Sequence, residues 1–198
     1  MKKIFVLVVL VMLLANSSSI GQSYTTTSYS IALPTGDLNS FISAPSFRGI
    51  AFDYRKLIQP NIGIGITTGW NTFFEEKAFA TYTIDNRSLS GKQWRYMNSF
   101  PLFLSGDYYF KPGDDLNPYV GLGVGTIYNK RATDMGIFRL EEDAWSFAFQ
   151  PQVGFFYSVN HFAGISVALK YSQGLAAGDF AASQSFFSLN IGYVFMGN

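Results

Sequence analysis

The sequence predicts an all-β protein: a closed, antiparallel, up-and-down transmembrane β-barrel of eight strands, with ten as the alternative count. Three observations favour this fold. Several segments alternate apolar residues with small or polar ones, which is the pattern of strands with two unlike faces. Short and long connections alternate between these segments, and the charged residues are concentrated in the connections. Short turns at one end and long loops at the other are typical of transmembrane barrels.

The composition limits the class of protein further. Of 198 residues, 48% are hydrophobic, 18% are aromatic and 14% are charged, and cysteine is absent. Low charge with many aromatic residues argues against a disordered chain. Without cysteine the chain has no disulfide framework, no cysteine-ligated zinc site and no lipid anchor on cysteine. The length fits one domain.

The N-terminus has the layout of a secretory signal peptide. Lys2 and Lys3 precede an apolar run, Ile4–Ala15, which is too short to span a membrane as a helix. Small and polar residues follow, and we expect cleavage after Gly21. Residues 1–21 are therefore predicted to be removed, leaving one barrel domain over residues 22–198. The mature chain is then close to neutral, which gives no basic field that would favour nucleic acid.

The first half of the mature chain contains four predicted strands. Residues 24–33 are rich in Thr and Tyr, which favour strands. Residues 48–56 and 62–71 alternate large apolar residues with smaller or polar ones. Residues 96–110 continue the alternation, although Pro101 inside this segment predicts a sheet edge or a bulge.

The second half contains four more. Residues 118–125 alternate Val and Leu with glycine, and residues 145–158 alternate aromatic residues with small or polar ones around Pro151. Residues 163–172 and 187–195 alternate as clearly as residues 62–71 and 118–125. Pro151, like Pro101, predicts an edge or a bulge in its strand.

The connections divide into two kinds. Three are short and hold turn-forming residues: Leu57–Asn61, Lys111–Asn117 and Val159–His161. Four are longer and are expected to be loops: Pro34–Phe47, Phe73–Arg95, Lys130–Ala144 and Gly174–Ser183. We expect the turns to face the periplasm and the loops to face the outside of the cell.

Neither face of the predicted strands resembles a surface in water. One face is aromatic and aliphatic, which suits lipid, and the other is small and polar, which suits a barrel interior. The interior of an eight-stranded barrel is just wide enough for side chains to fill. Five inward glycines leave room for longer side chains opposite: Gly63, Gly65, Gly121, Gly123 and Gly125.

Two acids and two bases are predicted to lie inside strands and point inward. They are Asp53, Arg55, Asp107 and Lys170, joined by Gln150 and Gln152 as further polar fillers. Because the four charges sum to zero, we expect a mutually satisfied network, since an unpaired buried charge is strongly destabilising. The alternative is a polar path that conducts an ion or a small solute.

Three segments resemble small bacterial outer-membrane β-barrel proteins of the OmpX/OmpW type. They are residues 29–38 (YSIALPTGDL), 118–125 (PYVGLGVG) and 189–195 (LNIGYVF). The resemblance implies an outer membrane and lipopolysaccharide as surroundings, and recognition of the last strand by the outer-membrane assembly machinery. Many such proteins end on an aromatic residue, whereas Met196, Gly197 and Asn198 follow Phe195 here. We expect a monomer.

The sequence offers little catalytic chemistry. Its one histidine, His161, is predicted to lie in a periplasmic turn, on the wrong side for acting on surface lipid, so we expect neither an enzyme nor a cofactor. Asp114–Asp115 follow Pro-Gly, which is ordinary turn chemistry rather than a metal site. Two charged clusters, Glu75–Lys77 and Arg139–Asp143, are expected to be solvated, and pairing with lipopolysaccharide through divalent ions is the alternative.

Three functions follow from these residues. The first is a structural or surface-interaction barrel that acts through its extracellular loops. The second is a channel for a small, apolar solute, as the resemblance to OmpW suggests. The third, a lipid-modifying enzyme, is disfavoured because no histidine lies in a suitable place.

Overall fold

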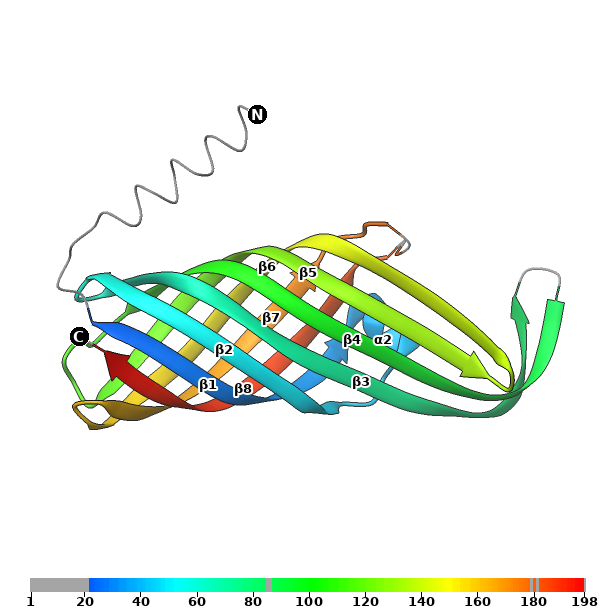
Figure 1. The fold of residues 1–198 in the computed structure, drawn as a ribbon, viewed down its shortest axis with the longest axis horizontal. Helices are drawn as coiled ribbons and strands as arrows, with labels where there is room; N and C mark the ends of the chain where they lie inside the picture. Colours follow the sequence, from blue (N-terminus) through cyan, green and yellow to red (C-terminus); the bar gives the residue numbers. More distant parts are fainter. Residues whose placement is uncertain (1–21, 85–86, 179, 181, 198) are drawn as a thin grey trace, which may run out of the picture.

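The computed structural model describes residues 22–84, 87–178, 180 and 182–197. Within them, eight strands form a closed barrel in which each strand pairs antiparallel with the next and β8 pairs with β1 (Figure 1). The strands are β1 (Ser23–Thr35), β2 (Ser46–Gln59), β3 (Ile62–Ile84), β4 (Arg87–Tyr109), β5 (Leu116–Met135), β6 (Phe138–Asn160), β7 (Ala163–Gly174) and β8 (Gln184–Gly197). The predicted fold class and strand count are confirmed. The predicted signal peptide lies outside the described residues.

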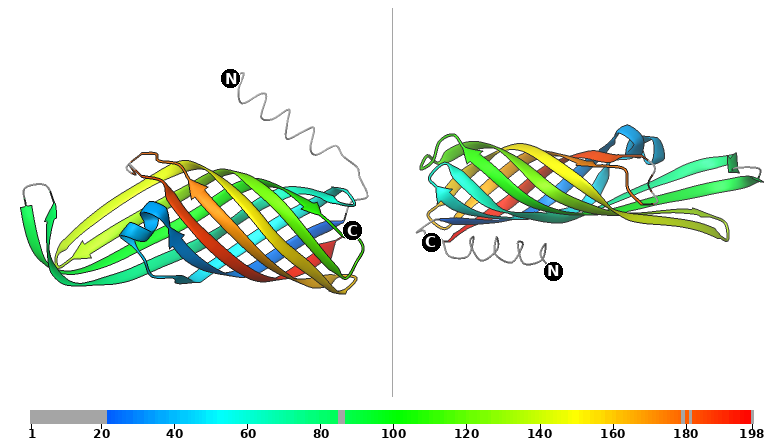
Figure 2. Two further views of the ribbon diagram at one scale, coloured as in Figure 1. Left: turned by 180° about the vertical axis from the view of Figure 1, so that it is seen from behind. Right: turned by 90° about the horizontal axis from the view of Figure 1, so that it is seen from above.

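The strands differ greatly in length. β1, β2, β7 and β8 have 12 to 14 residues, whereas β3 to β6 have 20 to 23. The pairing of β2 with β3 ends at Gly49 and Asn71, and that of β6 with β7 ends at Ala148 and Gly174. Beyond those pairs, residues 72–84, 87–98 and 129–147 continue as a four-stranded sheet that projects from the barrel (Figure 2). We call this sheet the extension.

The extension corrects two predicted loops. Residues 73–95 and 130–144 were expected to be loops, but their described residues, 73–84, 87–95 and 130–144, form the outer parts of two long hairpins. The prediction placed most of the charged residues in connections rather than in strands. Charge ends a strand's passage through lipid, but it does not end β-pairing once both faces of the sheet meet water. The charged residues of these segments therefore lie within strands, outside the lipid-facing wall.

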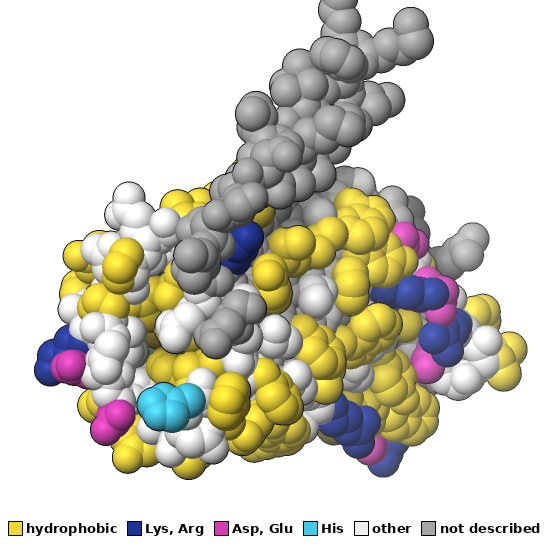
Figure 3. Space-filling view, turned by 60° about the vertical axis from the view of Figure 1, so that its left-hand side comes forward, with side chains coloured by type: hydrophobic (Ala, Val, Ile, Leu, Met, Phe, Trp, Pro, Cys, Tyr) yellow, Lys and Arg dark blue, Asp and Glu magenta, His cyan; other side chains and the backbone are white. Residues whose placement is uncertain are grey.

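The outer wall of the barrel is apolar, as predicted. Side chains at the middle of the wall are about half exposed, among them Ile66 at 50%, Leu122 at 51% and Val153 at 51%. Aromatic residues border this band at both ends. Toward the extension they are the exposed Trp70 and Trp145 and the partly exposed Phe100 and Tyr128, which we call the upper girdle. Toward the short turns they include the exposed residues Tyr108, Tyr157 and Tyr193. Hydrophobic side chains cover much of the wall seen in Figure 3. An apolar band between aromatic girdles is the outer surface of a membrane-spanning barrel.

Helices contribute little to the described part of the chain. None of them has the length and hydrophobicity that a membrane-spanning helix requires. One short helix, α2 (Gly36–Phe41), follows β1 and lies at the mouth of the barrel next to the extension (Figures 1 and 2).

The two prolines do not mark sheet edges. Pro101 and Pro151 lie inside continuous strands and pair with β5, opposite Ile127 and Leu122. On their other side the ladder skips the proline: β3–β4 pairing passes from Thr68–Leu102 to Asn71–Ser99. Because proline has no N–H to donate, a local gap in one ladder suffices to accommodate it. The expected interruption is therefore confined to one neighbour.

Candidate functional site

The four predicted lumen charges meet in the centre of the barrel. Arg55 Nε lies 2.5 Å from Asp107 Oδ2, and Arg55 Nη2 lies 3.3 Å from Asp53 Oδ1. Lys170 Nζ donates to both carboxylate oxygens of Asp53 at 2.8 Å. Arg55, Asp107 and Lys170 are at most 4% exposed. The structure thus joins charges from β2, β4 and β7 into one buried chain of ion pairs.

Neutral groups complete the hydrogen bonding of this chain. Arg55 Nη1 donates to the carbonyl oxygens of Tyr54 and Ile66, both at 3.0 Å. Arg55 Nη2 also donates to Thr67 Oγ1 at 2.8 Å, and Thr67 Oγ1 in turn donates to Asp53 at 2.7 Å. All five guanidinium donors therefore have acceptors, which is the condition under which a buried arginine is tolerated.

The two glutamines fill the lumen beside the charges. Gln152 Nε2 donates to Asp107 Oδ1, and Gln150 Nε2 donates to Ser172 Oγ at 2.8 Å. An added Cβ at Gly121 would stand 1.9 Å from Asp107 Oδ1 and 2.8 Å from Gln152 Nε2. The inward glycine therefore provides the space that the polar side chains occupy.

An aromatic cluster closes the lumen between the charges and the short turns. Tyr24 lies edge-on to Tyr109 with ring centroids 5.8 Å apart, and it stacks on Phe156 at 5.3 Å. Tyr109 and Tyr119 lie 5.4 Å apart. Leu57 packs into the same buried cluster. We call this cluster the tyrosine floor.

Helix α2 closes the opposite end. Leu38 and Ile42 are fully buried and pack against Phe73, Met97 and Phe186, with Phe73 and Phe186 in edge-on contact at 5.5 Å. Gly36, with a φ of 55°, takes the left-handed conformation that lets the chain leave β1 and enter the helix. The helix and its apolar contacts form a plug over the lumen.

Side chains of the extension hold the plug in place. Arg95 Nη1 donates to the carbonyl oxygen of Phe41 at 2.8 Å. The guanidinium groups of Arg95 and Arg131 lie 5.1 and 5.0 Å from the centre of the Phe41 ring, within the range of cation–π contacts. Glu75 accepts hydrogen bonds from Ser43 N at 2.7 Å and Ser43 Oγ at 2.8 Å. The plug is thus tied to the inner face of the extension.

The sequence contains a helical pattern at the plug, which the search for strand alternation did not detect. Leu38, Phe41 and Ile42 have the i, i+3, i+4 spacing of an apolar helix face. The segment was predicted to be a loop because it is short and lies between strands. Thr67, the hydroxyl that joins Arg55 to Asp53, was also missed, because a threonine in a strand has no sequence feature that marks it.

The spaces between the three closures are small. A cavity of about 30 Å³ lies between the tyrosine floor and the charges. One of about 10 Å³ lies on the plug side and is lined by Ser30, Asn71 and Asn190. A single water molecule needs about 10–15 Å³ of such space. These cavities therefore suit a few water molecules and are far too small for a solute.

The residues considered for catalysis and for metal binding lie in different turns. His161 follows Asn160 in the turn between β6 and β7, and Asp114 and Asp115 lie in the turn before β5. Among the described residues, no group of three or more His, Cys, Asp or Glu side chains could hold a metal ion.

The outer face of the extension carries a ladder of exposed ion pairs. Lys92 Nζ lies 2.7 Å from Glu76, and Lys130 Nζ lies 3.0 Å from Glu141. Arg139 Nε lies 2.6 Å from Glu141 Oε1. Both charged clusters of the sequence therefore lie in strands, where their residues form ion pairs with the neighbouring strand or within their own strand. Exposed pairs of this kind add little stability.

We expect the plug tie to respond to acid. Burial alone would raise the pKa of Glu75, but hydrogen bonds from Lys77 and Ser43 outweigh it and hold the pKa below its ordinary value of 4.5. A lowered folded-state pKa means that the tie is fully formed above the unfolded-state pKa and is lost as pH falls through the folded value. The Ser43 amide resonance should titrate with a midpoint below 4.5 in an NMR experiment. Glu75→Gln should abolish that titration, and a midpoint above 4.5 would contradict the tie.

Comparison of the sequence with models of protein families and with curated proteins finds no match. Solved structures do share the fold. Ail, the attachment invasion locus protein of Yersinia pestis, in complex with the heparin analogue sucrose octasulfate, aligns with a TM-score of 0.54 at 10% identity, over 89% of this chain and 99% of Ail. Neisserial surface protein A aligns with a TM-score of 0.53 at 16% identity, over 89% and 97% of the two chains. The outer membrane protease OmpT of Escherichia coli aligns with a TM-score of 0.51 at 7% identity, over 91% and 98%.

The fold and the apolar wall define a transmembrane β-barrel of the bacterial outer-membrane type. Within that class, this chain has the eight-stranded, up-and-down form, and the predicted resemblance is confirmed at the level of the fold.

Proposed function

We propose that this protein resides in a bacterial outer membrane as a closed barrel and acts through the extension, which contacts molecules at the cell surface. The observation that carries this proposal is the division of the molecule. The membrane-spanning part is filled by the tyrosine floor, the charge chain and the plug, while the extension holds a four-stranded sheet clear of the wall. Ail and neisserial surface protein A, which have the same fold, support a role at the surface.

A channel for a small solute is the second candidate, and the filled lumen argues against it. A solute would have to displace Leu38 and Ile42 at one end and the tyrosine floor at the other. Between them it would have to separate Lys170 from Asp53, which would leave buried charges unpaired.

An enzymatic role is the third candidate and has the least support. OmpT is a protease with this fold, but His161 lies in a turn at the end of the barrel opposite the extension. A general base there would face the periplasm, away from surface substrates. We propose that the chain is not an enzyme.

The apolar outer wall and the aromatic girdles indicate which molecules we expect around the barrel. The apolar band faces lipid, and the girdles place the ion-pair ladder of the extension at the level of the outer leaflet's charged and saccharide groups, so lipopolysaccharide is the expected neighbour. The assembly machinery is expected to recognise β8, whose pairing with β1 from Ser23–Gly197 to Thr35–Ser185 closes the barrel. We propose a monomer.

Conductance tests the closed lumen. Purified protein in planar bilayers should show no single-channel steps. Leu38→Asp, which displaces the plug, should also remain silent because the charge chain and the tyrosine floor still block the lumen. Steady conductance of the unmodified protein would contradict the proposal and favour the channel.

A shortened extension tests the surface role. Removal of residues 77–92 and 133–140 should leave a barrel that still resists unfolding in detergent, because those residues pair only within the extension. Under this proposal, bacteria that carry the full-length protein should attach to epithelial cells or to one another more strongly than bacteria without it, and bacteria that carry the shortened protein should not. Attachment unchanged by the deletion would contradict this role.

A further inference from the structure

The two hairpins of the extension separate at its tip and leave a groove between them. β4 pairs with β5 only as far as Trp94 and Asp134, whereas each hairpin continues beyond that pair. The separation is visible in Figure 2. The groove has a volume of about 410 Å³ and is lined by Trp94, Tyr96, Asp134, Gly136, Ile137, Phe138 and Arg139.

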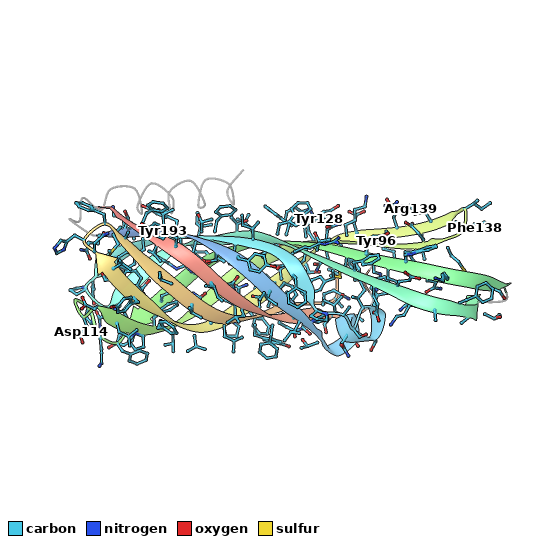
Figure 4. The ribbon with its side chains drawn as sticks, turned by 90° about the horizontal axis from the view of Figure 1, so that it is seen from below. Tyr96, Asp114, Tyr128, Phe138, Arg139 and Tyr193 are labelled. Carbon is cyan, nitrogen blue, oxygen red and sulfur yellow. The ribbon has the colours of Figure 1, made fainter. Side chains whose placement is uncertain are left out.

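The groove lies on the same face as the lipid-facing wall. β4 pairs with β5 without a break from Tyr109 to Trp94, so its even-numbered residues stay on one face from Leu104 to Trp94. In Figure 4, Tyr128, Tyr96, Arg139 and Phe138 follow one another toward the tip, whereas Tyr193 and Asp114 lie toward the short turns. The groove therefore continues the surface that the upper girdle begins.

The groove's height above the girdle identifies the layer it meets. Six residues separate Tyr128 from Asp134 along β5, which is about 20 Å of strand. At a strand tilt of about 40°, this distance corresponds to about 15 Å above the girdle. Phospholipid headgroups occupy only about 7 Å beyond the hydrocarbon. The groove therefore lies above the headgroup layer. In a glycolipid, the part of the molecule at that height is the sugar chain.

The chemistry of the groove suits a sugar ring. Trp94, Tyr96 and Phe138 offer aromatic faces, on which the apolar face of a hexose ring stacks, and Tyr96 is braced by Phe74 at a ring distance of 5.0 Å. Arg139 offers hydrogen-bond donors. Asp134 Oδ1 lies 3.6 Å from Arg139 Nε, too far for a hydrogen bond, and it accepts none in the protein.

Charge balance points to a neutral sugar. Arg139 is matched by Asp134 and Glu141, and Lys92 is matched by Glu76, so no unbalanced positive charge is present to select a sulfate or a phosphate. We propose that this groove binds a neutral hexose unit in the core saccharide of the membrane's own outer-leaflet glycolipid. This deepens the proposed surface role, on which it rests for the outward orientation of the extension.

The test uses the full barrel with Trp94 as its only tryptophan, obtained by Trp70→Phe and Trp145→Phe, in phospholipid nanodiscs without glycolipid. Core oligosaccharide released from lipopolysaccharide is the probe. It should change Trp94 fluorescence saturably, and Tyr96→Ala or Arg139→Ala should weaken binding by about thirtyfold, the loss that defines an aromatic or arginine hot spot. Tyr96→Phe, which keeps the ring, should bind normally. Phe79→Ala, an exposed aromatic residue of the extension outside the groove, is the matched control.

Four outcomes would overturn the proposal. They are no response to the core oligosaccharide, an equal loss in Phe79→Ala, a response in nanodiscs containing lipid A alone, and a response to a sulfated glycan such as heparin but not to the core. The last would assign the groove to foreign saccharides. The conductance measurement separates this inference from the proposed function, because a conducting barrel that still binds the core would retain the groove and reject the closed lumen.

Discussion

Lys170→Met should destabilise the folded barrel by about 3–5 kcal/mol, the typical loss when one partner of a buried ion pair is removed. Lys170 is 2% exposed and donates to both oxygens of Asp53 at 2.8 Å. Its removal leaves Asp53 with Arg55 and Thr67, and Arg55 is already engaged by Asp107. The free energy of unfolding in urea, measured in lipid vesicles by tryptophan fluorescence, provides the test.

A second substitution in Lys170→Met shows whether Asp53 or Asp107 carries the unpaired charge that destabilises the barrel. Asp53→Asn in the Lys170→Met background should recover part of the loss, because it leaves the Arg55–Asp107 pair intact and the lumen neutral. Asp107→Asn in the same background also restores neutrality, but it replaces one of the two carboxylate oxygens that accept from Arg55 Nε and Gln152 Nε2 with an NH2 donor, so it should recover less. Equal recovery by both would mean that net charge alone governs stability. An unchanged free energy in Lys170→Met, together with altered conductance, would contradict the closed lumen.

Much of the charge chain could be predicted from the sequence, but its pairing could not. The alternation of residues 48–56 and 163–172 sets the inward direction of Asp53, Arg55 and Lys170. Asp53 and Lys170, however, lie on β2 and β7, which are not neighbours in the sheet. Their contact is made across the lumen, and sequence spacing carries no information about which side chains meet across a barrel.

In the extension, the sequence prediction missed strands rather than contacts. The prediction placed most charged residues in connections, which is correct for the lipid-facing wall and wrong for the strands that leave it. The outer hairpins place opposite charges on neighbouring strands, offset from directly facing positions, as in Glu76–Lys92 and Lys130–Glu141. Such cross-strand pairs become recognisable only once the register is known, because their partners are separated by a turn of unknown length.

Leu122→Arg should destabilise the barrel by about 2–4 kcal/mol, the cost of arginine at the middle of a lipid-facing wall. Leu122 is 51% exposed on the outer face of β5 and pairs with Gly106 of β4. It lies well inside the band between the two girdles, where the arginine side chain has no short route to water. The loss should appear in urea unfolding from vesicles and should be smaller when the bilayer is thinner.

Gly106→Ala is the matched control for Leu122→Arg. The nearest atom to an added Cβ at Gly106 is Gly63 O at 4.0 Å, so alanine fits on the lipid face without a clash and should leave the free energy of unfolding nearly unchanged. Gly123→Ala is unsuitable, because its Cβ would lie 3.0 Å from Ser105 Oγ and 3.1 Å from Phe103 Cβ in the packed interior. Leu122→Arg could instead leave the free energy of unfolding as unchanged as Gly106→Ala does. β5 would then not face lipid at Leu122, and the inside–outside assignment of the wall would have to be reversed.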